Sequence, residues 1–117
     1  MASHNDFGRW AEDMAASWLT THGYKILHRN WRYSRFEVDI IAQKEQMLHF
    51  IEVKARSGKK FGWPEESVDS QKIQNLIDAA GEFSERHPEW KRIQLDILSI
   101  EFGSNGTKFS LFEDVYL

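Results

Sequence analysis

Apolar residues recur along this chain at two different spacings, which predict two helices and five strands. Residues 6–22 and about 67–86 carry apolar side chains at every third or fourth position, as amphipathic helices do. Shorter runs rich in β-branched and aromatic residues predict strands at residues 24–32, 36–43, 47–55, 91–102 and 107–112. The resulting order, αβββαββ, favours an α/β fold in which helices flank a mixed central sheet with a buried central strand.

Turn-forming residues indicate how these elements connect. Asn5 or Asp6 can cap the start of the first helix, and Gly23 suits its C-terminal end. The short polar segment 44–46 predicts that the strands on either side of it pair as an antiparallel hairpin. Glycines and a proline within residues 56–66 predict an exposed loop.

The predicted hairpin carries the most informative polar residues. Glu37 and Asp39 are two positions apart, so we expect them on one face of their strand, with the apolar residues at positions 38 and 40 on the other. Glu52 and Lys54 share a face in the same way. A turn centred on residues 45–46 places Asp39 opposite Glu52. Charged groups at the end of a central strand are costly unless they pair or bind an ion.

Two interpretations of this arrangement follow from the residues alone. In the first, Asp39 and Glu52 form a hard-oxygen site suited to Mg²⁺ or Mn²⁺, with the Val53 carbonyl and a substrate phosphate as further ligands. Lys54 would then orient an attacking water or stabilise charge that develops on the phosphate. In the second, Glu37, Asp39, Glu52 and Lys54 form only a cross-strand salt-bridge network on a partly solvated sheet face.

The composition narrows the class of protein. The chain has 117 residues, 41% hydrophobic and 28% charged, as expected of one globular domain spanning residues 1–117 rather than a disordered or transmembrane chain. The absence of cysteine excludes disulfides, thiolate metal sites and a cysteine nucleophile. Charged residues interrupt the N-terminal segment, so we expect no signal peptide and no membrane association, and a cytoplasmic location.

Charge is unevenly distributed along the chain. The net charge is −3, yet residues 25–60 carry +5 and the remainder carries −8. A basic segment on an acidic body is compatible with a local phosphate-binding surface, and equally with a solvated face.

The spacing of the hairpin residues resembles a known nuclease core. Asp39, followed thirteen residues later by Glu52-Val53-Lys54, is similar to the PD-(D/E)XK nucleases, especially the archaeal Holliday-junction resolvases. FGRWAEDMAASWLTTHGYKILHRNWR, FEVDIIA and HFIEVKAR together resemble the YraN family of predicted endonucleases over nearly the whole chain. The matching positions are Glu12, Gly23, Tyr24, Ile26, Leu27, Asn30, Arg32, Glu37, Asp39, Glu52, Lys54, Arg56, Pro64, Val68, Lys72 and Asp96.

This resemblance implies a restriction-endonuclease-like αβββαβ core and a Mg²⁺- or Mn²⁺-dependent endonuclease that acts on DNA rather than RNA. It implies metal ligation by Asp39 and Glu52, with Lys54 as the residue that positions the base. Glu12 would be a further ligand or water-binding group, or alternatively a solvent-facing helix acid. We expect Glu37 to form a salt bridge with a neighbouring arginine.

Basic and aromatic residues around the hairpin are candidates for binding nucleic acid, with ordinary surface or core roles as the alternative. The phosphate-binding candidates are Arg29, Arg32, Arg35, Arg56, Lys59 and Lys60. Lys72 resembles a family lysine that faces the site. Trp31 and Trp63 either stack unpaired bases or cover the core. By analogy with the resolvases, a homodimer is expected.

Two departures from the family pattern keep other functions open. Phe36 and Ala11 stand where the family has glycine, and Phe36 implies either altered DNA docking or a repacked strand start. The competing functions are a non-catalytic nucleic-acid-binding domain with the nuclease fold, and a small interaction protein whose acids and lysine form salt bridges.

Overall fold

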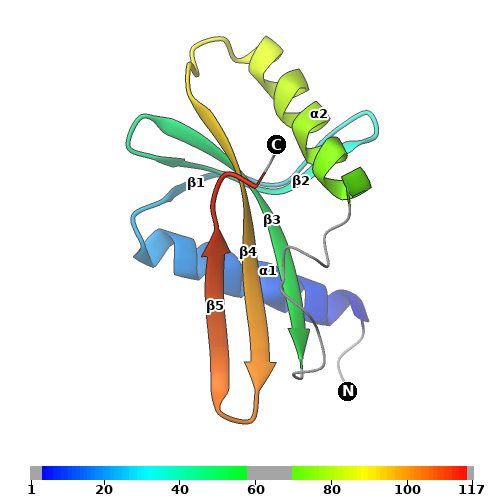
Figure 1. Ribbon diagram of the computed structural model, residues 1–117, viewed down its shortest axis with the longest axis vertical. Coiled ribbons are helices and arrows are strands. Elements are labelled where there is room, and N and C mark those ends of the chain that lie inside the picture. The colour runs from blue at the N-terminus through cyan, green and yellow to red at the C-terminus, as the bar shows by residue number, and fades with distance from the viewer. Residues whose placement is uncertain (1–3, 58–69, 116–117) are drawn as a thin grey trace.

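The predicted order of helices and strands is confirmed by the computed structural model, which describes residues 4–57 and 70–115 (Figure 1). The elements are α1 (His4–Thr21), β1 (Lys25–Tyr33), β2 (Phe36–Lys44), β3 (Met47–Ser57), α2 (Ser70–Arg86), β4 (Ile93–Gly103) and β5 (Gly106–Phe112). Within these described segments, no helix combines the length and apolar character needed to cross a membrane.

All five strands form one mixed sheet in the order β1-β2-β3-β4-β5. The β1–β2, β2–β3 and β4–β5 pairs are antiparallel, whereas β3 and β4 are parallel, with α2 between them in the sequence. The two helices lie on opposite faces of the sheet, and β3 is its central strand (Figure 1). This architecture is compatible with the expected αβββαβ core, to which β5 adds an edge strand.

Each helix closes a separate apolar core against its face of the sheet. The core under α1 contains Ala15, Leu19, Tyr24, Ile40, Ala42, Ile51, Leu98 and Ile100. The core under α2 contains Val38, Ile41, Leu48, Phe50, Leu76, Ala79, Ala80, Phe83 and Leu95. The sheet is therefore covered on both faces, as the apolar character of β3 requires.

The C-terminal end of α1 is as predicted, but its start is not. Gly23 adopts a φ of 93°, and the amide of Tyr24 donates to the carbonyl of Leu19 at 2.9 Å, which ends the helix. At the other end, α1 already includes His4, so the prediction that Asn5 or Asp6 caps the helix is wrong. Acidic residues are also favoured inside the first turn, because the positive end of the helix dipole stabilises a negative charge there.

The apolar stripe of α1 is only partly buried. Ala15 and Leu19 are fully buried, whereas Phe7 is 37% exposed and Trp10 is 44% exposed. The first turns of α1 therefore contribute less to the core than the stripe predicts.

Strand β2 departs from strict alternation just where the candidate acids lie. Val38 packs in the core under α2, while Ile40 packs in the core under α1, so the prediction that these two residues share a face is wrong. On the neighbouring strand, Asn30 has a φ of 53°, and the β1–β2 pairing passes from Arg29↔Ile40 to Trp31↔Val38 without it. The change of face in β2 therefore coincides with a gap in its pairing with β1.

Candidate functional site

The hairpin register brings Asp39 and Glu52 together, as predicted. The β2–β3 pairing extends to Ile40 and Ile51. One residue beyond each of them, Asp39 and Glu52 line the same hollows. The amide of Val53 donates a hydrogen bond of 2.8 Å to Asp39 Oδ2. The carboxylate of Asp39 is thus held against the backbone of β3 beside Glu52.

Two adjoining hollows meet at this acid pair. The larger, of about 250 Å³, is lined by α1, β2, β3 and α2 residues that include Glu12, Lys54 and Lys72. The smaller, of about 150 Å³, lies toward α2 and includes Glu37 and Asn75. Asp39, Glu52 and Lys72 line both hollows, so they form the centre of the candidate site.

Both carboxyl groups are harder to ionise than usual. Burial raises the pKa of Asp39 to about 6, with Glu12 and Glu37 adding to the rise, while the Val53 amide and Lys72 oppose it. Burial, followed by the charge of Asp39, raises the pKa of Glu52 to about 7, opposed by Lys72 and Lys54. The two acids are thus desolvated and repel one another, which a bound cation would relieve.

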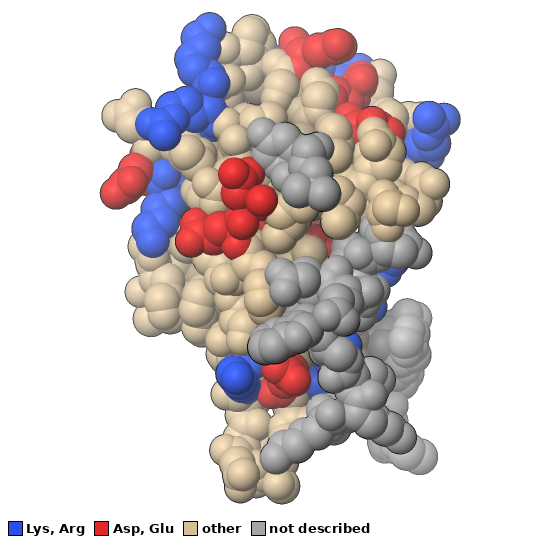
Figure 2. All heavy atoms as spheres, viewed as in Figure 1, with Lys and Arg blue, Asp and Glu red and all other residues tan. Residues whose placement is uncertain are grey.

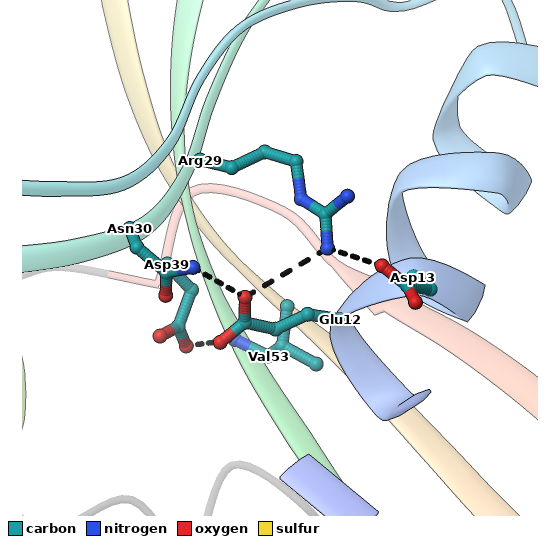
Figure 3. Close-up of polar contacts among 6 residues, drawn as sticks. All are labelled: Glu12, Asp13, Arg29, Asn30, Asp39 and Val53. Atoms are coloured by element: carbon teal, nitrogen blue, oxygen red, sulfur yellow. Dashed lines mark hydrogen bonds and ion pairs between the residues drawn. The ribbon is translucent and has the colours of Figure 1, made fainter. Parts of the chain in front are cut away.

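Glu12 reaches this pair from α1 rather than facing solvent (Figure 3). Its Oε1 accepts a hydrogen bond of 2.8 Å from Asn30 Nδ2 and lies 3.9 Å from Arg29 Nη2. Arg29 itself is held at 2.6 Å by Asp13. Asn30, which has a positive φ within β1, therefore also holds the carboxylate of Glu12, a role that sequence patterning does not reveal.

The candidate phosphate-binding arginines are largely engaged with other groups. Arg32 lies 3.3 Å from Glu37, the ion pair expected for that acid, and Arg35 lies over the ring of Phe36. Arg56 is only 9% exposed. Lys59, Lys60 and Trp63 fall outside the described residues.

The visible surface carries charge of both signs. Figure 2 shows Lys and Arg side chains interspersed with Asp and Glu over the described part of the face that α2 covers. The excess of basic residues in segment 25–60 therefore does not appear there as a single continuous basic surface.

Trp31 and the two residues that stand where the family has glycine, Phe36 and Ala11, pack within the fold. Trp31 packs edge-on against Phe83 at 5.5 Å and covers the core under α2. Phe36 packs against the same core, and its backbone has no positive φ that would need glycine. Ala11 is 3% exposed and lines the larger hollow beside Glu12.

A buried pair elsewhere in the sheet is not revealed by any pattern in the sequence. His49 Nδ1 lies 2.8 Å from Asp96 Oδ2, and Asp96 Oδ1 accepts hydrogen bonds from Gln94 Nε2 and the Asp114 amide, both at 2.9 Å. The pair joins β3, β4 and the C-terminal segment. No spacing signal links two residues 47 positions apart.

The residues present fit a divalent ion that is shared with a substrate. Within residues 4–57 and 70–115, no group of three or more His, Asp or Glu side chains could hold a metal ion alone. Mg²⁺, however, is commonly bound through one or two carboxylates together with substrate phosphates and water. Asp39 and Glu52 offer such a pair of hard, desolvated oxygen donors.

The fold and site define a mixed α/β domain with a half-buried acid pair at the open end of its central hairpin and lysines beside the pair. The profile described as "Uncharacterised protein family UPF0102" matches residues 11–100, and the chain belongs to this family, the YraN-like family that its motifs resemble. A UPF0102 protein of Flavobacterium psychrophilum is 40% identical over 116 residues, covering 99% of this chain and 98% of that relative. A UPF0102 protein of Flavobacterium johnsoniae is 43% identical over 115 residues, covering 95% of this chain and 92% of that relative. A UPF0102 protein of Bacteroides thetaiotaomicron is 42% identical over 106 residues, covering 91% of this chain and 87% of that relative.

Proposed function

We propose that this protein is an endonuclease that hydrolyses DNA phosphodiester bonds with Mg²⁺ or Mn²⁺ bound at Asp39 and Glu52. One observation carries the proposal: two desolvated carboxyl groups with raised pKa values share a pocket with Lys54 and Lys72. Shifted carboxyl groups that converge in a hollow are a feature of functional sites. A purely structural salt bridge would instead lower the pKa of each acid.

The metal and the lysines divide the chemistry between them. A divalent ion held by Asp39, Glu52 and the Val53 carbonyl would polarise the phosphate and make an attacking water more acidic. In the proposed site, Lys54 orients that water or stabilises charge on the phosphate oxygens. Lys72 contributes a second positive charge from α2. Glu12, fixed by Asn30, holds water on the α1 side.

DNA is proposed as the substrate in preference to RNA because the motifs resemble those of Holliday-junction resolvases. The same resemblance underlies a proposed homodimer, which would present two sites to one substrate. A non-catalytic DNA-binding domain with this fold would share the binding properties but would not cleave.

The test measures metal binding and cleavage on the same samples. Calorimetry with Mn²⁺, and nicking of branched and single-stranded DNA, are followed for the intact protein, Asp39→Asn and Glu52→Gln. Glu45→Gln is the matched control, since Glu45 is an exposed acid in the turn at the far end of the same hairpin. We expect both active-site variants to lose Mn²⁺ binding and nicking together, and the control to keep both.

Other outcomes separate the competing functions. Binding of DNA without metal-dependent nicking would identify the non-catalytic domain. Failure of the intact protein to bind Mn²⁺, with and without DNA, would leave the acid pair without a catalytic role. Sedimentation of the intact protein tests the homodimer.

A further inference from the structure

An aromatic cluster lies at the surface beside the candidate site. Phe7 and Trp10 project from the first turns of α1, and Phe102 comes from the C-terminal end of β4. The ring centroids lie 4.3 Å apart for Trp10 and Phe102, 5.5 Å for Phe7 and Phe102, and 6.0 Å for Phe7 and Trp10. The three rings therefore hold one another in place while two of them remain more than one-third exposed.

This cluster is continuous with the acid pair. Phe7 lines the same hollow as Asp39, Glu52 and Lys54. A strand whose phosphate lies at the two acids would thus pass directly by the aromatic surface. The lysines of that hollow supply positive charge for the neighbouring phosphates.

The chemistry of the cluster favours a nucleobase as its occupant. Exposed aromatic rings that adjoin one another indicate a binding surface. Proteins that bind single-stranded nucleic acid combine such rings with cations along the backbone, because every base has a face that can stack. A paired base in a duplex is already stacked between its neighbours and cannot offer that face to a protein surface.

We propose that Phe7, Trp10 and Phe102 form a stacking platform for an unpaired base next to the scissile phosphate, so that the substrate is DNA with a single-stranded segment. The proposal rests on the proposed function, since it places the platform beside that phosphate. It assigns binding, not chemistry, to the three rings.

Binding without cleavage tests the platform directly. Fluorescence anisotropy in EDTA compares a short oligo-dT strand with an abasic strand of the same length, which keeps the phosphates but lacks bases. The intact protein is expected to bind oligo-dT about five- to hundredfold more tightly than the abasic strand, the range typical of base–aromatic stacking. Trp10→Ala should bind both strands equally, with its abasic affinity unchanged, while Trp10→Phe keeps most of the preference.

Tyr33→Ala provides the matched control, because Tyr33 is 38% exposed and lies at the β1–β2 turn, against Arg86. Its preference for oligo-dT should equal that of the intact protein. Equal affinity of the intact protein for both strands, or an equal loss on both strands in Trp10→Ala, would overturn the platform. The platform would also be overturned if the protein were a dimer that Trp10→Ala dissociates without changing the preference for oligo-dT. The rings would then contact a second copy of the chain.

Metal-dependent cleavage distinguishes this proposal from the proposed nuclease. If the protein does not cleave with Mn²⁺ but prefers oligo-dT, and Trp10→Ala abolishes that preference, the platform is supported and the nuclease proposal is wrong. If Trp10→Ala cleaves single-stranded DNA with the same kcat and KM as the intact protein, the nuclease proposal is supported and the platform is overturned.

Discussion

Asp39 and Glu52 carry charge where the fold disfavours it, and this has a consequence for stability. Their pKa values rise from 3.8 to about 6 and from 4.5 to about 7 on folding, mainly through burial. The native state therefore binds protons more tightly than the unfolded state. The resulting stabilisation is fully present below about pH 4 and is lost as the pH rises through the native pKa values.

Without divalent ions, we expect the contribution of these acids to make the melting temperature about 5 °C or more higher at pH 5 than at pH 8. Thermal melts in EDTA across this range measure the slope. Glu52→Gln removes one of the two groups, so it should flatten the profile and raise stability at pH 8. A variant profile that runs parallel to that of the intact protein would contradict this account.

The buried pair of His49 and Asp96 has the opposite character, because its polar atoms are satisfied. Asp96 accepts hydrogen bonds from the His49 ring, from Gln94 and from the Asp114 amide. Asp96→Ala leaves these donors without their acceptor and should reduce the free energy of unfolding by about 3–5 kcal/mol. Urea unfolding measures this loss.

The exposed acid Asp78 of α2 serves as the control. Asp78→Ala should change the free energy of unfolding by about 0.5 kcal/mol or less. Equal urea midpoints for the two variants would show that the His49–Asp96 pair contributes nothing to the fold.

At the scale of elements, Phe83 is the largest of the four buried side chains through which α2 packs on the sheet. Phe83 is 2% exposed and meets the rings of Trp31 and Phe50 edge-on at 5.5 Å, and it stacks on His87 at 4.1 Å. Phe83→Ala removes the shared partner of these rings and should destabilise the protein by about 3–5 kcal/mol. Denaturant unfolding checks the value against Ile93→Ala, whose side chain is 37% exposed and should cost far less.

The elements show which features local sequence determines. The two-residue turn at Glu45–Gln46 and the apolar periods on either side of it fix the β2–β3 register. The proximity of Asp39 and Glu52 could therefore be predicted. Gly23 likewise marks the end of α1, because its positive φ suits glycine. Hairpins and helix ends depend on residues close in sequence.

Features that depend on distant residues could not be predicted. The irregularity in β2 lies beside Asn30 of the neighbouring strand, and the exposure of Trp10 depends on how α1 lies across the sheet. The spacing of apolar residues shows which side of α1 is apolar, but it does not show how far along α1 the core extends. The ion pair of Arg29 with Asp13 of α1 likewise depends on packing and not on sequence spacing, and it engages one of the arginines expected to bind phosphate.

At the scale of the whole molecule, the distribution of charge limits how the protein can hold DNA. The net charge is −3, and Arg29 and Arg32 are paired with acids around the site. Among the described residues that line the larger hollow, the cations are Lys54 and Lys72. Phosphate contacts at the site should therefore be few, and stacking should contribute a large share of the affinity.

This balance predicts a weak dependence of binding on salt. Each phosphate neutralised on a single strand contributes about −0.7 to the slope of log affinity against log salt. Two contacts, by Lys54 and Lys72, give a loss of about tenfold or less between 50 and 200 mM salt. Titrating oligo-dT in EDTA at both salt concentrations measures the slope, and Lys72→Gln should lower its magnitude by about 0.7. A loss of a thousandfold would require about seven contacts. The basic segment at residues 25–60 would then bind DNA over a much larger surface than the described lysines of the site provide.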